Sequence, residues 1–408
     1  MRISIFPFLL LFIIIVPGAY YLYVEKISYS SGAFLTSMFI LIIYFIKNKK
    51  ITLDKSFFIV MIFLAIIFIC SFYSMISFDW FDFNRFFLSY FLISTIMISS
   101  NLFFQFSLKI DDKKLYKYVS IVFYVVLLDG FIFLIKKNIF FYGKPFLLLF
   151  PEISHFSIIF LPLLMFKVLV SKNIIYIYVI NVFSLVLSIY VENLTLLVGT
   201  IMVMSIYSIK KTIIFILIPL VFIISNIGID NMSYFTSRLS FDNPNNVSTL
   251  VFLSGWERAY LNLIDFSFLG IGFNQLGYEG QIGYYQNQIM SLGLRNLNLK
   301  DGGSLAPKLI SELGVFGIFL ILMYLIFFVK IMYKLKKYSY SYTHLNAFYI
   351  SIFIMSSVNI FMRGSGYFSP IIFLLFGSIF YFIKLNYSDG DNFLKQKILP
   401  GIPLALKS

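Results

Sequence analysis

The chain has 408 residues, of which 60% are hydrophobic and only 12% charged, and its mean hydropathy is +0.92. This composition excludes a soluble globular domain and places the chain among integral membrane proteins. The formal net charge of +14 resides largely in short lysine clusters between apolar blocks, which is typical of cytoplasmic loops and argues against a nucleic-acid partner. Because Cys70 is the one cysteine, the chain can form neither an intramolecular disulfide nor a cysteine metal site.

Apolar blocks of the length needed to cross a bilayer, about 17–25 residues, recur along the chain. We therefore predict an all-α integral membrane protein with about twelve transmembrane helices. They lie at 5–24, 29–46, 57–77, 86–106, 116–135, 154–170, 174–191, 194–209, 212–229, 309–331, 345–362 and 367–385. The first block resembles a signal peptide, but the many spans after it favour a retained helix. An alternative for 174–191 and 194–209 is a single kinked unit around Glu192 and Asn193.

A long polar stretch interrupts these spans between the ninth and the tenth. It divides the chain into an N-terminal transmembrane bundle (1–228), a large loop (229–307), C-terminal transmembrane helices (308–385) and a tail (386–408). A polar segment of this length must leave the lipid, because unpaired backbone groups cannot lie in hydrocarbon. The loop also contains a glycine-rich segment, Gly270–Gly280, which lacks the Lys-Ser/Thr ending of a phosphate loop, so we predict a turn there.

Lysine placement predicts the orientation of these segments, because cytoplasmic loops are enriched in positive charge. With a cytoplasmic N-terminus, the dense lysine clusters fall on the inner side and the large loop on the outer side. The inner clusters are Lys47, Lys49, Lys50 and Lys55, then Lys109, Lys113, Lys114 and Lys117, then Lys167, Lys172, Lys210 and Lys211, and finally Lys330, Lys334, Lys336 and Lys337. The prediction is a multi-pass membrane protein with both termini in the cytoplasm. The pair Lys136 and Lys137 is a local exception.

The arginines follow the opposite rule. Apart from Arg2, all of them fall on the predicted outer side, at Arg85, Arg238, Arg258, Arg295 and Arg363. A guanidinium group is planar and permanently charged, and it binds phosphate or carboxylate through two parallel hydrogen bonds. Each of these arginines could also be an interfacial anchor or a loop ion pair. As a set, they favour an anion site.

Four stretches are predicted to meet at the outer side: 79–85, 144–155, the large loop and 359–368. The second contains Glu152 and His155, and His155 could be a base or could cap the start of a helix. Asp129 lies inside an apolar span, which makes it a candidate functional residue, although a hydrogen bond that fixes helix packing is the alternative. The sequence shows no metal-binding cluster, so neither a metal nor another cofactor is expected.

The chain resembles bacterial O-antigen polymerases of the Wzy type, within the superfamily that includes O-antigen ligases. The resemblance lies in the many spans with one large outer loop and in four segments that are similar to motifs of the family. They are Trp256-Glu-Arg-Ala with Leu269-Gly-Ile-Gly-Phe273, then Ser304 to Gly317, then Pro151-Glu-Ile-Ser-His-Phe156, and Arg363-Gly-Ser-Gly-Tyr-Phe. Arg85 also fits the pattern. The resemblance covers the whole chain, and topology carries much of it.

This resemblance implies a glycosyltransferase of the bacterial inner (plasma) membrane that needs no metal and joins oligosaccharide repeat units linked to undecaprenyl pyrophosphate. The expected partners are that lipid-linked oligosaccharide, the membrane lipid and a chain-length regulator protein. We predict that Arg85, Arg258 and Arg363 bind the pyrophosphate, with Arg238 and Arg295 as weaker members. Glu152, His155 and Glu257 are the candidates to deprotonate or orient the acceptor hydroxyl.

Two other functions stay open at this point. A ligase of the same superfamily would move finished glycan to another acceptor, but ligases carry a histidine in the large loop, and residues 229–307 contain none. A lipid-linked oligosaccharide flippase would place charged residues within several spans. Here Asp129 is the main charge inside a span.

Overall fold

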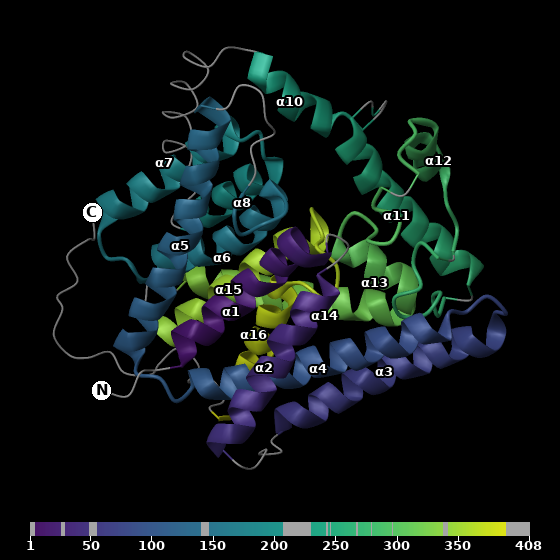
Figure 1. Cartoon of the computed structure of the whole chain (residues 1–408), viewed down its shortest axis with the longest axis horizontal. Coiled ribbons are helices and arrows are strands. Elements are labelled where there is room, and N and C mark those ends of the chain that lie inside the picture. The colour runs from purple at the N-terminus through teal and green to yellow at the C-terminus, as the bar shows by residue number, and fades with distance from the viewer. Residues whose placement is uncertain are drawn as a thin grey trace.

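The computed structural model describes residues 5–25, 29–48, 55–139, 147–206, 230–241, 244, 246–266, 268–278, 280–295, 297–337 and 342–388. Its elements are helices, in the order α1 (Phe6–Tyr20), the π-helical turn η1 (Tyr21–Glu25), α2 (Ser30–Asn48), α3 (Lys55–Ser77), α4 (Phe83–Ser107), α5 (Asp112–Ile139), α6 (Ile153–Val170), α7 (Ile174–Tyr190), α8 (Leu194–Met204), α10 (Asp230–Leu239), α11 (Val247–Asp265), α12 (Tyr284–Ser291), α13 (Leu305–Leu313), α14 (Val315–Lys337), α15 (His344–Phe361) and α16 (Pro370–Ser388). The predicted span 212–229 and nearly all of the predicted tail lie outside the described residues. Figure 1 shows the arrangement.

Eight of the described segments are long and apolar enough to cross a membrane. They are α1 with η1, α2, α3, α4, α5, α6, α14 and α15. Three further apolar helices, α7, α8 and α16, have shorter apolar stretches. The described chain is thus an α-helical protein with several helices suited to a bilayer, and the count of twelve spans stays a prediction.

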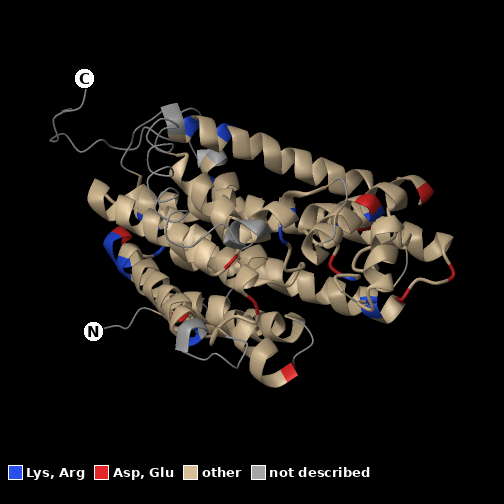
Figure 2. Cartoon of the chain, turned by 90° about the horizontal axis from the view of Figure 1, so that it is seen from above, with Lys and Arg blue, Asp and Glu red and all other residues tan. Residues whose placement is uncertain are grey.

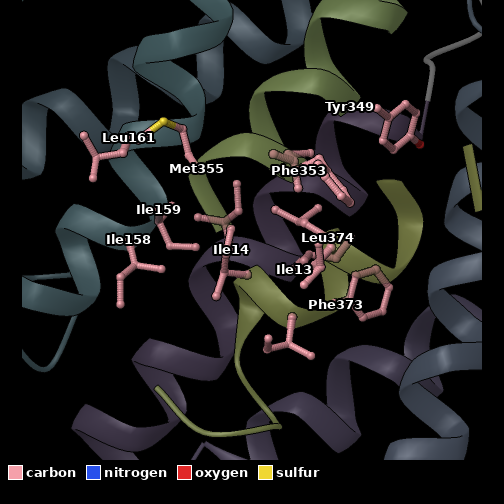
Figure 3. Packing of buried hydrophobic residues seen from close by; sticks show 14 of the residues in the cluster. Ile13, Ile14, Ile158, Ile159, Leu161, Tyr349, Phe353, Met355, Phe373 and Leu374 are labelled. Carbon is pink, nitrogen blue, oxygen red and sulfur yellow. The ribbon is translucent and has the colours of Figure 1, made fainter. Parts of the chain in front are cut away.

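The core lies where α1, α6, α15 and α16 meet. Figure 3 shows Ile13 and Ile14 of α1 packed near Ile159 of α6, Phe353 of α15 and Leu374 of α16. Each of these five side chains is at most 4% exposed. Apolar side chains all round a helix, as in α6 and α15, indicate a helix at the centre of a bundle. In the apolar segment of each of these two helices 72% of the residues are buried. In α14 only 17% are buried, so α14 presents most of its surface outward.

The central helices run between two different polar ends. At one end Lys167, near the end of α6, donates hydrogen bonds to Tyr116 and Ser120 near the start of α5. At the other end Glu152, just before α6, pairs with Arg363, just after α15. With about 1.5 Å per residue, the 18 residues of α6 separate these ends by roughly 27 Å. Figure 2 shows the charged residues mainly at helix ends and in connecting segments.

In the part of the polar stretch after residue 229 that the structure describes, the chain forms the helices α10, α11, α12 and α13 rather than an irregular loop. Figure 1 shows α10 leading to α11, with α12 and α13 beside α11. The sequence placed 309–331 in a single span, but α13 ends at Leu313 and α14 begins at Val315. Gly314 between them has φ +56°. Helix α13 therefore packs with α11, and it straddles the predicted boundary between the loop and the C-terminal spans.

Candidate functional site

A cavity with a volume of about 370 Å³ lies where the loop meets the ends of the central helices. Segments far apart in sequence line it: the start of α6, the break between α7 and α8, the end of α10, the start of α11 and the end of α15. The charged and polar residues on its wall are Glu152, Ser154, Glu192, Asn193, Thr195, Tyr234, Arg238, Ser248, Thr249 and Arg363. Small-molecule sites in proteins usually have volumes of about 300–1,000 Å³. This cavity is therefore the best candidate for a binding site.

Arg363 and Glu152 form an ion pair on the cavity wall, with 2.9 Å between Nη2 and Oε2. Ser154 donates a hydrogen bond to the same carboxylate oxygen at 3.0 Å. Burial raises the pKa of Glu152, but the surrounding positive charge and these hydrogen bonds outweigh burial and hold the pKa below its ordinary value. Glu152 is thus an ionised partner that orients the Arg363 guanidinium.

The segment that carries Arg363 is fixed to the loop. The backbone N–H of Gly364 donates to the carbonyl of Gly303 at 3.0 Å, and the side-chain oxygen of Asn359 accepts from Ser365. A Cβ on Gly364 would come within 2.8 Å of the backbone of Ser304. Of the four stretches predicted to meet, 144–155, the loop and 359–368 therefore do so here.

Arg238 lies at the end of α10 and faces the same cavity. Its guanidinium stacks over the ring of Tyr234, 4.2 Å from the ring centre. Its Nε is buried and has no hydrogen-bond partner among the described residues. A buried donor without an acceptor costs about 1–3 kcal/mol. Burial lowers the pKa of Arg238, and the neighbouring positive charge of Arg363 adds to this effect. An anionic ligand between Arg238 and Arg363 would accept a hydrogen bond from this Nε and would offset the repulsion between the two positive charges.

Glu192 completes the charged wall, and the sequence did not single it out as a site residue. It lies between α7 and α8 with φ +56°, a left-handed conformation that is uncommon for residues other than glycine. In the sequence, the polar pair Glu192-Asn193 between two apolar blocks predicted a break between two helices. It did not predict that Glu192 lies on a cavity wall.

His155 does not line this cavity. It is the third residue of α6, after the N-cap residue Glu152, and the ring of Tyr29 lies 5.1 Å away in an edge contact. It borders a separate cavity of about 10 Å³, and its Nδ1 has no partner among the described residues. A space of that size holds about one water molecule. His155 is therefore no helix cap, and it does not line the larger cavity.

Arg258 and Glu257, two other predicted site residues, hold the loop together away from the cavity wall. The Arg258 side chain is 2% exposed and donates to the carbonyls of Gln281 (3.1 Å) and Leu299 (2.7 Å). Burial lowers the pKa of Arg258 to about 10. Glu257 accepts from the backbone N–H groups of Tyr284 and Tyr285 at the start of α12. The geometry thus gives both residues a role in the loop's own structure.

Arg85 and Arg295 are also apart from the cavity. Arg85 donates through Nε to the carbonyl of Asn274, and its guanidinium lies 3.6 Å from the centre of the Tyr278 ring. It ties the start of α4 to the glycine-rich segment, so 79–85 also meets the loop. Arg295 is exposed and does not line the cavity. The five predicted arginines therefore form no single cluster, and only Arg238 and Arg363 share one site.

The glycine-rich segment is a turn, as predicted, and Glu312 of α13 is its anchor. This fully buried carboxylate accepts from the backbone N–H groups of Asn274 (2.8 Å) and Leu276 (3.2 Å). Lys308 lies 4.0 Å away. Burial raises the pKa of Glu312, against the opposing charge of Lys308. The sequence offered Glu312 only as part of the motif from Ser304 to Gly317.

Asp129 has a structural role: it forms hydrogen bonds that fix a neighbouring segment, which was the alternative to a functional role. Its side chain is 2% exposed and accepts from the backbone N–H groups of Leu148 (2.8 Å) and Leu149 (3.2 Å). These bonds fix the segment that precedes α6, and thereby Glu152. Asp129 supports the site without lining its cavity.

Within the described ranges, no group of three or more His, Cys, Asp or Glu side chains is placed to hold a metal ion. The chain matches no family model, no curated protein and no solved structure.

Proposed function

We propose that the chain is a polysaccharide polymerase that joins oligosaccharide repeat units linked to undecaprenyl pyrophosphate, at the periplasmic side of the inner membrane. The observation that carries this proposal is the cavity of about 370 Å³ in which Arg238 and Arg363 share a wall with two carboxylates. The site would be formed by Arg238 and Arg363 as pyrophosphate ligands and Glu152 as the group that orients Arg363.

The chemistry fits this wall. Transfer of a glycan from a lipid pyrophosphate breaks the bond between the sugar's anomeric carbon and a phosphate oxygen, and the diphosphate leaves with the electron pair. Guanidinium groups that are already positioned stabilise such developing negative charge without reorganisation. Each charge-assisted hydrogen bond contributes roughly 1.5–3 kcal/mol. The unpaired Nε of Arg238 supplies a donor that no described residue uses.

The rest of the cavity suits the other parts of such a substrate. Its apolar wall includes Leu239, Phe241, Phe252, Phe361 and Met362. A lipid-linked sugar has both a charged diphosphate and an apolar chain, so it needs both kinds of wall. Aromatic side chains also offer flat surfaces for sugar rings.

The test is in vitro polymerisation by the purified full chain in proteoliposomes. The probe is the lipid-linked repeat units extracted from source cells in which the gene has been deleted, with no other acceptor added. The wild type should produce a ladder of glycans. Arg363→Ala and Arg238→Ala should each reduce its rate at least about 100-fold, the effect of removing one positioned donor. Arg295→Ala is the matched control, since Arg295 is exposed and does not line the cavity.

Two outcomes would replace the proposal. A ligase of the same superfamily would produce no ladder until a second glycan acceptor is supplied. A flippase would move labelled lipid across the vesicle membrane without forming new glycosidic bonds. Wild-type ladders from both the Arg238 and the Arg363 variants would remove the cavity from the reaction.

A further inference from the structure

Two positive side chains meet beside one exposed tyrosine near the start of α4, apart from the cavity. The guanidinium of Arg85 lies 3.6 Å from the centre of the Tyr278 ring, and the Nζ of Lys300 lies 4.0 Å from the same centre. Lys300 also donates a hydrogen bond to the Tyr278 hydroxyl. Tyr278 is 43% exposed, so these charges lie at the surface of the protein. We call Arg85, Tyr278 and Lys300 the cationic cluster.

No carboxylate in the described part of the chain forms an ion pair with Arg85 or Lys300. Asp82 accepts from the backbone N–H of Arg85, and Asp301 lies 3.9 Å from a lysine of α13. The hydrogen bond from Lys300, together with the charges of both cations, holds the pKa of Tyr278 below its ordinary value, although burial acts in the opposite direction. An anion that reaches this surface therefore meets positive charge that the protein has not neutralised.

Hydrogen bonds to the loop hold Arg85 in place. Its Nε donates to the carbonyl of Asn274, and its Nη2 lies 3.5 Å from the side-chain oxygen of the same residue. The backbone N–H of Asn274 donates in turn to the buried carboxylate of Glu312 at 2.8 Å. Because the guanidinium is already positioned, binding an anion costs little further ordering of this side chain.

An exposed apolar face of α4 begins directly beside Arg85. Residues three apart on a helix are neighbours, so Leu88, which is 72% exposed, lies next to Arg85. Phe87 and Phe91 are also exposed. Helix α4 is long and apolar enough to cross a membrane, so this face would contact acyl chains in a bilayer. A molecule with a phosphate attached to acyl chains would contact both the cationic cluster and this face.

We propose that the cationic cluster and the adjacent face of α4 bind an anionic glycerophospholipid of the surrounding bilayer. Arg85 presents planar donors to the headgroup phosphate, and Lys300 adds a second positive charge. A free anion would not use the apolar face, and a lipid without net charge would gain less from the two cations. The cluster lies outside the cavity, so this inference does not depend on the proposed function.

The experiment measures which lipid lies beside α4. The full chain with Leu88→Cys is labelled with a fluorophore and reconstituted in vesicles that contain either brominated phosphatidylglycerol or brominated phosphatidylethanolamine, whose bromine atoms quench nearby fluorescence. The native Cys70 is 1% exposed and should stay unlabelled. The matched control is Phe319→Cys, at an exposed residue that is likewise near the start of its helix, α14.

The label at position 88 should show a preference for phosphatidylglycerol that the label at position 319 lacks. A basic residue near an anionic lipid strengthens binding about fivefold, so Arg85→Gln and Lys300→Gln should each lower the preference by about that factor. Lys300→Arg keeps the charge and should keep the preference. Arg295→Gln removes an exposed arginine outside the cluster and should change nothing. High salt should weaken the preference, because it screens exposed charges.

Equal quenching by both lipids at position 88 would overturn the proposal. A preference that survives in both Arg85→Gln and Lys300→Gln would also overturn it. Lys300 is exposed, so its replacement should leave the fold intact, and thermal unfolding checks every variant. Two competitors identify other occupants. If a small molar fraction of undecaprenyl pyrophosphate displaces the brominated lipid, the occupant is a lipid-linked diphosphate, and if inorganic phosphate displaces it, the site binds free anions. Either displacement would contradict the proposal.

Discussion

Arginine side chains in this protein have two different environments. Arg258 donates to two backbone carbonyls and is 2% exposed, whereas Arg363 lies on a cavity wall with a carboxylate beside it. The first arrangement satisfies the chain's own acceptors. The second leaves donors of the guanidinium facing a cavity, where a ligand could use them. Composition alone cannot separate these environments, because both use the same residue type on the same predicted side.

Replacing Arg258 should therefore affect stability rather than ligand binding. Arg258→Met keeps much of the volume but leaves the carbonyls of Gln281 and Leu299 without their donor. We expect a loss of about 3 kcal/mol in the stability of the loop, from charge-assisted hydrogen bonds that are no longer made. Thermal unfolding and limited proteolysis between α11 and α12 would measure it, with Arg295→Met as the exposed control. If the Arg258→Met variant unfolds like the wild type but binds the lipid-linked donor more weakly, Arg258 is instead a pyrophosphate ligand.

At the scale of elements, glycines set how closely the loop and α13 approach each other. Gly270 has φ +82°, and the backbone N–H groups of the next two residues, Ile271 and Gly272, bond to the carbonyls of Ser311 and Glu312 in α13. A Cβ on Gly270 would lie 2.6 Å from the backbone of Glu312. The contact thus needs glycine for both its conformation and its lack of a side chain.

Two alanine variants separate these two requirements. Gly293 has a similar φ of +79°, but a Cβ there would meet nothing within 4 Å. Gly293→Ala should lower the free energy of unfolding by about 1 kcal/mol, the cost of a left-handed alanine. Gly270→Ala should lower it by about 3 kcal/mol, because the steric clash adds to that cost. Chemical or thermal unfolding of the purified protein measures the difference, and equal losses would show that the loop does not pack on α13 as described.

At the scale of the whole molecule, the cavity and the lysine-rich ends lie at opposite ends of the central helices. The ion pair of Glu152 with Arg363 marks one end of α6, and Lys167 lies near the other. If positive charge marks the cytoplasmic side, the cavity opens on the far side of the membrane. That location suits a substrate that carries its own activation as a lipid pyrophosphate.

Cysteine labelling tests this orientation. The native Cys70 is 1% exposed, so the wild type should take up little reagent. Tyr260→Cys places a thiol on α11 at a residue that is 64% exposed, and Lys113→Cys places one at the exposed start of α5. A maleimide that cannot cross the inner membrane should label the Tyr260 variant in cells with a permeabilised outer membrane and the Lys113 variant only after lysis. The reverse pattern would place the loop in the cytoplasm and end the polymerase proposal.

Sequence reasoning identified much of the fold because span length and apolar composition are local properties. Eight of the predicted spans correspond to helices suited to a membrane, and the break at Glu192 and Asn193 is real. The predicted span 309–331 corresponds to α14 but starts too early, because α13 is also apolar on one side and a hydropathy average does not detect the turn at Gly314. Sequence also identified three of the four charged residues that we assign to the cavity: Arg238, Arg363 and Glu152.

The sequence by itself determined an α-helical membrane protein with one large polar excursion and with arginines set apart from lysines. Only the tertiary structure decided which arginines are available to a ligand, because that depends on contacts between segments more than 100 residues apart, such as Glu152 with Arg363. It also brought Glu192 to the cavity wall. The physical reason is that hydropathy is a sum over neighbours in the chain, whereas a guanidinium is satisfied or left free by whatever the fold places beside it.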